Sequence, residues 1–381
     1  MSPRAPGPLP AASVLVAAGL LVGGCGGPHG ASTSRAALER RPAGTTSLLQ
    51  AVAAVDDSVA WVAGHAATWL RTVDGGRSWT SGTVAGADGL EFRDVWAAGP
   101  DTAFLLAAGP GERSRIYATT DGGERWTPRF VNRDTAAFYD CMDFWDSGHG
   151  LVFGDAVRGR FRVLRTDDGG RSWRPVADSL LPAARAGEGG FAASGACAAA
   201  GPGGRAWIGT GATPRPRVLA ARGRGAWRPA PVPIAGGPQA GVMAVAFADS
   251  LRGIAVGGDL AARPDRPGDG PDSGPGGSRA PAGAAGGARV ALTRDGGRTW
   301  RAGGEPTLPG PVFGVAWVPG TPGPTAVAVG PGGADLSRDG GVTWSRLDTA
   351  AYWSVGFASP RTGWLVGPGG RVVRVSLGGG R

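Results

Sequence analysis

A short phrase recurs along the chain and restricts the possible folds more than any other feature of the sequence. It consists of Ser or Thr, any residue, Asp-Gly-Gly, any two residues and Trp. The Asp and Trp of the intact copies are Asp74 and Trp79, Asp121 and Trp126, Asp168 and Trp173, Asp295 and Trp300, and Asp339 and Trp344. Consecutive copies lie 47 residues apart at first and 44 apart later, and an altered copy without the Asp occupies 221–227. A repeat of this period predicts an array of similar structural units.

Each residue type in the phrase has a physical role in a tight turn. The Asp carboxylate accepts N–H groups of its own turn, and the two glycines supply positive φ where a hairpin reverses. The Trp packs the following strand against a neighbouring sheet. The 71 Gly and 32 Pro among 381 residues would otherwise suggest low complexity, but much of the glycine is periodic.

Short apolar runs around each phrase predict four strands per unit. In the third unit we expect strands at 141–145, 151–154, 161–166 and 172–176. The same pattern fits seven units, whose first strands are expected near Leu49, Phe92, Tyr139, Ala193, Val242, Val312 and Trp353. This organisation predicts an all-β protein, a seven-bladed β-propeller of four-stranded antiparallel blades. The last unit ends after its third strand at 371–377, and we expect 35–42 to supply the missing outer strand.

The beginning of the chain is typical of an export signal. Arg4 precedes an apolar stretch at 11–22, and the run from Leu21 to Cys25 resembles a bacterial lipobox. We therefore expect 1–24 to be a lipoprotein signal peptide and Cys25 to be lipidated, which would hold the protein at the membrane surface or in the periplasm of the cell envelope. An ordinary signal peptide with an incidental Cys is the alternative.

The remaining sequence divides into a tether and one domain. Residues 25–34 are expected to form a flexible tether, and 35–381 the propeller. Thirteen of the 28 residues at 261–288 are Gly or Pro, which predicts a disordered insertion in the fifth blade.

The repeated phrase resembles the Asp-box of BNR repeats, which occur in sialidases, sortilin-like receptors and some glycan hydrolases. The longer blade pattern, over roughly 45–377, resembles the photosystem II assembly and stability factor propellers and their bacterial lipoprotein relatives. This resemblance implies a propeller that binds a membrane-protein precursor, with an arginine patch involved. Some relatives carry an oxidoreductase label, but the sequence has neither a dinucleotide-binding Gly-rich loop nor a C-x-x-C-H motif.

The sequence gives little support for a sialidase. Those enzymes use an arginine triad, a Tyr nucleophile paired with Glu, and an Asp acid, after an opening of the Phe-Arg-Ile-Pro type that is absent here. No Glu is evidently paired with Tyr117, Tyr139 or Tyr352. A glycan-active hydrolase that uses two carboxylates at the channel mouth is the enzymatic alternative.

The expected function is a non-catalytic binding or assembly module, acting as a monomer without cofactor or metal. Its expected partner is an envelope or membrane protein, or a glycan. The net charge of +9, carried entirely by Arg, also allows electrostatic docking to an anionic surface. These arginines are scattered along the chain, so we expect no nucleic-acid partner.

Polar residues of one propeller face form the candidate site. The loops between second and third strands and between blades share that face, and the Asp-box turns lie on the other. The candidate binding residues are His65, Asp140, Asp155, Glu188 and Asp259. Asp155 and Asp259 are expected at equivalent positions of two blades, which makes them the candidate catalytic pair. Alternatively, these side chains satisfy turn N–H groups or pair with Arg. Asp140 and Asp143 are expected to flank the first strand of the third unit.

Two cysteines follow Cys25 in the sequence. Cys141 and Cys197 are expected on the first strands of consecutive blades, where they form either a disulfide or two buried thiols. Their spacing does not resemble a metal site. Asp265, Asp269 and Asp272 could bind Ca²⁺, but their spacing matches no known calcium loop.

Overall fold

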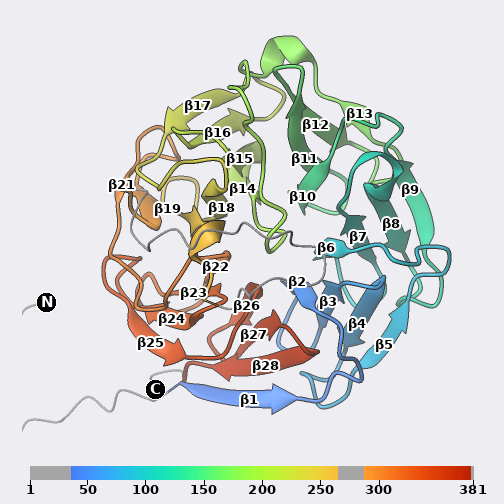
Figure 1. The fold of residues 1–381 in the computed structure, drawn as a ribbon. Helices are drawn as coiled ribbons and strands as arrows, with labels where there is room; N and C mark the ends of the chain where they lie inside the picture. The colour runs from blue at the N-terminus through green and yellow to red at the C-terminus, as the bar shows by residue number, and fades with distance from the viewer. Residues whose placement is uncertain (1–35, 265–286, 379–381) are drawn as a thin grey trace, which may run out of the picture. The chain divides into compact units, whose positions relative to one another are not determined.

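The computed structural model describes residues 36–264 and 287–378, and over these residues the chain forms seven four-stranded antiparallel sheets. The sheets are the blades of a closed ring, because the first strand of each blade contacts the first strands of both neighbouring blades (Figure 1). In six blades the strands follow chain order from the centre to the rim, and in the last blade β1 forms the outer strand. The predicted seven-bladed propeller is therefore confirmed.

The first three blades contain β2 (Leu49–Ala54), β3 (Ala60–Gly64), β4 (Thr68–Thr72) and β5 (Thr80–Thr83); β6 (Phe92–Ala97), β7 (Ala103–Ala107), β8 (Arg115–Thr119) and β9 (Thr127–Val131); and β10 (Tyr139–Phe144), β11 (Gly150–Val157), β12 (Arg160–Thr166) and β13 (Arg174–Pro175). Blades four and five contain β14 (Ala198–Gly201), β15 (Arg205–Gly209), β16 (Arg217–Arg222) and β17 (Arg228–Pro231); and β18 (Ala240–Phe247), β19 (Gly253–Asp259), β20 (Val290–Thr293) and β21 (Arg301–Ala302). The last two blades contain β22 (Gly314–Trp317), β23 (Ala326–Gly330), β24 (Gly333–Ser337) and β25 (Ser345–Asp348); and β26 (Ser354–Ser359), β27 (Thr362–Gly367), β28 (Arg371–Ser376) and β1 (Ala37–Arg41).

The ring is closed by the strand nearest the N-terminus. β1 pairs with β28 in an antiparallel ladder that runs from Ala37 opposite Ser376 to Arg41 opposite Val372. The last blade thereby gains the outer strand that the sequence predicted. This pairing holds the two ends of the propeller together and covers an open sheet edge.

The helical segments of the described residues are short 3₁₀ turns: η1 (Gly111–Arg113), η2 (Asp178–Leu180), η3 (Pro202–Gly204) and η4 (Leu260–Ala262). Over the same part of the chain, no helix has the length and apolar character needed to cross a membrane.

The Asp-box turns have a shared hydrogen-bond network, which the first box illustrates. The Thr72 hydroxyl donates to Asp74 Oδ1 at 2.9 Å and accepts the Gly76 N–H at 2.8 Å. Asp74 also accepts the Ser78 N–H at 3.0 Å and the Ser78 hydroxyl at 2.6 Å. These bonds from Ser78 hold the pKa of Asp74 well below its usual range. The corresponding Thr or Ser hydroxyl binds the Asp in the boxes of Asp121, Asp168, Asp295 and Asp339.

The second glycine of each Asp-box packs against the preceding blade. Gly123 has a φ of 93°, and a Cβ built on it would lie 2.5 Å from the ring of Trp69 in blade one. A Cβ on Gly76 would overlap the ring of Trp364 in blade seven. The Asp-box Trp126 packs on the same interface, with its ring centroid 5.8 Å from that of Trp69. Each box therefore requires glycine both for its turn and for contact between blades.

Two expected features differ in the structure, and others fall outside the described residues. Blade four begins at Ala198 instead of near Ala193, because 189–197 run across the centre of the ring. The outer strand of blade three contains only Arg174–Pro175. The signal peptide, Cys25, the tether and residues 265–286 of the insertion, with its three Asp, lie outside the described residues.

We predict that Gly123→Ala lowers the free energy of unfolding by about 3 kcal/mol. The methyl group adds left-handed backbone strain and overlaps an indole that cannot move freely in the interface. Urea unfolding at neutral pH measures the change. Gly159→Ala is the matched control, since Gly159 has a φ of 76° and open space around its Cβ position. The control should lose only about 1 kcal/mol. Equal losses in both variants would show that the interblade contact contributes nothing.

Candidate functional site

The residues Gly189–Cys197, which we call the central segment, occupy the middle of the propeller. They belong to the connection between blades three and four, which extends toward the centre between β10 and β14 (Figure 1). The segment bonds with three blades across the ring. The Val245 N–H donates to Ala196 O at 2.8 Å. The Ser194 hydroxyl donates to Phe313 O at 2.6 Å, and the Ser354 hydroxyl donates to Ser194 O at 3.2 Å.

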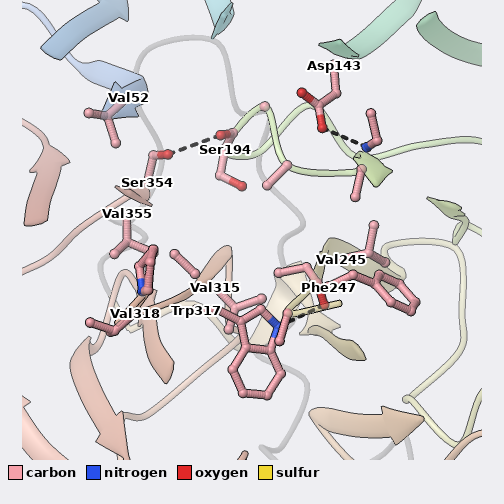
Figure 2. Close-up of a pocket in the computed structure, with 18 of the residues that line it drawn as sticks. Val52, Asp143, Ser194, Val245, Phe247, Val315, Trp317, Val318, Ser354 and Val355 are labelled. Atoms are coloured by element: carbon pink, nitrogen blue, oxygen red, sulfur yellow. Dashed lines mark hydrogen bonds between the residues drawn. The ribbon is translucent and has the colours of Figure 1, made fainter. Parts of the chain in front are cut away.

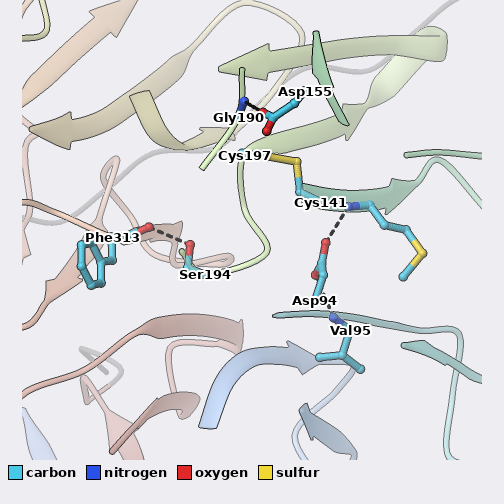
Figure 3. The surroundings of a disulfide bond; sticks show 9 residues. Asp94, Val95, Cys141, Asp155, Gly190, Ser194, Cys197 and Phe313 are labelled. Carbon is cyan, nitrogen blue, oxygen red and sulfur yellow. Dashed lines mark hydrogen bonds between the residues drawn. A yellow bond between two sulfur atoms is a disulfide. The ribbon is translucent and has the colours of Figure 1, made fainter. Parts of the chain in front are cut away.

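Blade three holds both ends of the central segment, and blade one holds residues between them. The Gln50 side-chain amide donates to Ala192 O at 2.9 Å and to Ala193 O at 3.2 Å. The Gly190 N–H donates to Asp155 Oδ1 at 2.9 Å. Cys197, at the other end of the segment, forms a disulfide with Cys141 of β10 (Figure 3). Cys197 thus precedes β14 instead of lying on it, contrary to the expectation that both cysteines occupy first strands.

Two carboxylates, one on the buried Asp94 and one on the half-buried Asp143, connect neighbouring blades around the segment. Asp94 accepts the Val95 N–H at 2.7 Å and the Met142 N–H at 2.6 Å, which joins blades two and three (Figure 3). Asp143 accepts the Ala200 N–H at 2.7 Å, which joins blades three and four (Figure 2). Burial raises the pKa of Asp94 well above its usual range and that of Asp143 to about 6. Asp94 was not among the residues predicted from the sequence, although an Asp inside an apolar first strand was a visible signal.

A cavity of about 600 Å³, the wide cavity, lies on the Asp-box side of the central segment. It is lined by equivalent residues of the first strands, by the central segment and by aromatic side chains (Figure 2). These apolar lining residues include Val52, Val245, Val315, Val355, Phe247 and Trp317. The Trp317 indole N–H already donates to Ala246 O at 3.1 Å, and the Ser354 hydroxyl is bound to the segment. The wide cavity therefore has both polar and apolar lining residues, and several of its polar side chains are already bonded.

A second cavity of about 260 Å³, the narrow cavity, lies on the opposite side of the segment. Its floor is formed by Phe191, Ala192 and Ala193. The polar wall consists of Gln50, His65 and Arg93 from blades one and two; the apolar wall contains Leu48, Leu260, Phe313 and Trp353. The guanidinium of Arg263 lies over the two aromatic rings, 5.6 Å from the Phe313 centroid and 5.1 Å from that of Trp353.

His65 belongs to a polar network in the narrow cavity. Its Nε2 lies 2.7 Å from Gln50 Oε1. Because the Gln50 amide nitrogen donates to the central segment, we assign the proton of neutral His65 to Nε2. Burial lowers the pKa of His65, while Glu91, whose carboxylate lies 3.8 Å away, opposes that shift. Glu91 also pairs with Arg93 at 2.6 Å.

The expected equivalence of Asp155 and Asp259 is wrong by one residue. Equivalent residues of the first strands pair with Gly64 in blade one, Gly154 in blade three and Gly257 in blade five. The residues that follow these glycines, which are His65, Asp155 and Gly258, therefore occupy the matching positions. A step of one residue turns a strand side chain to the other face. Asp259 instead begins η4, where its carboxylate accepts the Ala261 N–H at 2.9 Å.

Glu188 forms a buried ion pair. Arg217 donates to both of its carboxylate oxygens at 2.7 Å, and the Thr210 hydroxyl donates at 2.7 Å. Burial alone would raise the pKa of Glu188, but the bonds from Arg217 and its other donors outweigh burial and lower it. This carboxylate therefore stabilises the connection before the central segment.

Asp140 and Asp155 are the two predicted site residues that the structure brings close together. Each carboxyl group acts on the ionisation of the other. Asp140 and Asp143 both lie inside β10, whereas the sequence placed them beside the strand. Within the described residues, no group of three or more His, Cys, Asp and Glu side chains is placed to hold a metal ion.

We predict that Arg217→Met lowers the free energy of unfolding by about 3–5 kcal/mol. The substitution keeps an apolar stem but leaves Glu188, whose side chain is fully buried, without its counter-charge. Arg224→Met is the control because Arg224 forms an exposed ion pair with Asp167. Its loss should stay below about 1 kcal/mol. Chemical denaturation of both variants measures the difference, and similar small losses would contradict a structural role for Glu188.

Comparison with known proteins shows similarity of fold. No protein-family model matches the chain, and no curated protein matches it. A solved structure of YCF48 bound to D1 peptide is 18% identical, with a TM-score of 0.60 over 90% of this chain and 97% of that one. YCF48 from Cyanidioschyzon merolae is 15% identical, with a TM-score of 0.59 over 89% of this chain and 98% of that one.

A GH74 enzyme from Niastella koreensis is 13% identical, with a TM-score of 0.54 over 87% of this chain and 43% of the enzyme. At these identities the matches establish a seven-bladed propeller that is structurally similar to YCF48.

Proposed function

We propose that this protein is a non-catalytic module that binds a segment of a partner polypeptide at the narrow cavity. The observation that carries the proposal is the composition of this cavity. It combines a floor of packed backbone, a polar wall with His65 and Arg93, and an aromatic wall with Phe313 and Trp353. Aromatic and Arg side chains are the residue types that most often anchor protein–protein interfaces.

The size of the narrow cavity suits side chains better than a separate small molecule. Its volume of about 260 Å³ is below the roughly 300–1,000 Å³ of typical small-molecule sites. One or two side chains of a peptide could enter it while the peptide backbone crosses the surrounding loops. The solved YCF48 structure described as bound to D1 peptide supports this proposal, since that protein has the same fold.

A hydrolase is less well supported by the carboxylates of this face. Glycoside hydrolysis uses two carboxyl groups on either side of the bond that is cleaved. Asp155 is bonded to Gly190 and lies close to Asp140, while Asp259 caps η4 and Glu188 is bound by Arg217. Each of these carboxylates already has a structural partner, so we do not propose catalysis.

The partner that we propose is an envelope or membrane protein. The apolar leader and the lipobox-like run ending at Cys25 support an exported, lipid-anchored protein. A lipid on Cys25 would keep the propeller close to the membrane, where membrane-protein segments are available. The proposed module acts as a monomer and needs no cofactor, because recognition requires only the walls of the cavity.

Peptide binding tests the proposed function. Peptides selected from a random 12-residue display library on the wild-type propeller are labelled, and their affinities are measured by fluorescence anisotropy. We predict that His65→Ala and Arg263→Ala each weaken binding about tenfold, because each removes a polar contact at the narrow cavity. Trp317→Ala, in the wide cavity, is the control and should leave the affinity unchanged.

Two results would contradict this assignment. One is a selection that yields no peptide binding in the micromolar range. The other is a loss of affinity in Trp317→Ala but not in the narrow-cavity variants, which would place binding in the wide cavity. Circular dichroism of each variant verifies that the fold is retained.

A further inference from the structure

Blades one and three hold the central segment with equivalent pairs of side chains. Gln50 and Asp140 each follow the first residue of their inner strands. His65, directly after β3, and Asp155, inside β11, occupy matching positions of the two blades. In blade one the pair is Gln50 and neutral His65, which are hydrogen-bonded at 2.7 Å. In blade three the pair consists of two carboxyl groups. The same structural position therefore carries a neutral pair in one blade and an acidic pair in the other.

The acidic pair requires a proton for its internal hydrogen bond. Carboxylate oxygens only accept hydrogen bonds, so contact between Asp140 and Asp155 becomes favourable when one of them is protonated. Asp140 is only 2% exposed, and among the described residues its Oδ2 has no donor when both groups are ionised. A buried carboxyl group beside a half-buried one favours a state in which the two share one proton, and this proton belongs to the pair.

Among the described residues, one cation acts on the buried member of the pair. Arg93, on β6 of blade two, is the positive group that acts on Asp140. Asp143, on the same strand as Asp140, has a separate set of backbone donors. The central segment contributes no ionisable side chain, because its only cysteine is in the disulfide. Whether Asp140 and Asp155 together carry one negative charge or two therefore depends on whether the pair holds a proton.

The central segment lies directly on the acidic pair. A Cβ on Gly189 would overlap the Asp155 carboxylate, and one on Gly190 would lie 2.9 Å from Asp140 Cγ. The Gly190 N–H bonds to Asp155, as Figure 3 shows. Asp140 is buried in this packing, whereas Asp155 is half-buried. The same stretch continues into Phe191, Ala192 and Ala193, which form the floor of the narrow cavity.

We propose that Asp140 and Asp155 form a proton-dependent latch, which holds Gly190 and the adjoining Phe191 against blade three while the pair shares one proton and loosens this stretch when the proton is lost. Gly211 and Gln50 keep Gly189 and Ala192–Ala193 in place. The disulfide keeps the Cys197 end in place, so the movement is confined to Gly190 and Phe191. Because Phe191 forms part of the floor of the narrow cavity, this movement also changes the cavity. That consequence for binding rests on the proposed function, whereas the movement itself does not.

The latch opens as pH rises. Burial raises the pKa of both Asp140 and Asp155, so the folded protein retains a proton that the unfolded chain would lose. The stabilisation is complete below the ordinary Asp pKa of about 4 and is lost as pH increases through the raised values of the folded pair. The Asp-box residues respond in the opposite direction, since the pKa of Asp74 is lowered and its contribution is lost in acid.

Hydrogen exchange over the central segment tests the latch. Exchange of the amides of Gly190 and Phe191 is followed by mass spectrometry in the propeller from pH 5 to pH 9, and rates are corrected for intrinsic exchange. In the wild-type protein we expect protection to fall about tenfold or more as pH rises.

Asp155→Asn should remain protected throughout, because the Asn oxygen still accepts from Gly190 while its amide donates to Asp140. Asp140→Asn is the second variant, in which the new amide donates the hydrogen bond to Asp155. Asp259→Asn is the matched control on this face, since Asn also caps η4, and it should behave as the wild-type protein does.

The outcomes separate the latch from the proposed binding function. Constant protection in the wild-type protein, or an equal pH-dependent loss in both Asn variants, would overturn the latch. A pH-dependent loss that both Asn variants abolish would support it. If this loss occurs while the affinity for selected peptides does not change with pH, the latch stands and the narrow cavity is not the peptide site.

Discussion

The propeller depends on the packing of each Asp-box turn against the preceding blade. The Thr, Asp and glycine bonds make the turn rigid, and the second glycine places backbone directly against a ring such as Trp69 or Trp364. Any larger side chain at Gly76 or Gly123 would separate the two blades. Because the interface recurs around the ring, the same local geometry sets the angle between neighbouring sheets. The seven inner strands then enclose the axis at which both cavities lie.

A closed ring of sheets leaves the inner edge of every first strand without a neighbouring strand. Unpaired N–H and C=O groups at such an edge are costly when they are removed from water. This protein satisfies several of them with buried carboxylates, as Asp94 does for Met142, and with the central segment, as Ala196 does for Val245. The segment also separates the axis into a wide cavity and a narrow one. Residues 189–197 therefore both stabilise the centre of the ring and form part of the proposed binding site.

The periodic pattern was sufficient to predict the fold, including the outer strand at Ala37–Arg41 that completes the last blade. It was less successful at the site. The choice of Asp155, Asp259 and His65 assumed that loops of equal appearance have equal register. The ladder places Gly258, and not Asp259, opposite the equivalent position, which redirects the side chain. Asp94 was missed because its role comes from a bond to Met142, 48 residues later.

The sequence by itself determined the blade number, the turns and the closure of the ring, because these features depend on local residues that repeat with a fixed spacing. Only the tertiary structure decided that Gly189–Cys197 crosses the axis, that Asp140 lies close to Asp155, and that His65 and Trp353 face one cavity. These relations join segments far apart in the chain, and each occurs once. A periodic pattern carries no information about contacts that do not repeat, so packing around the axis alone determines them.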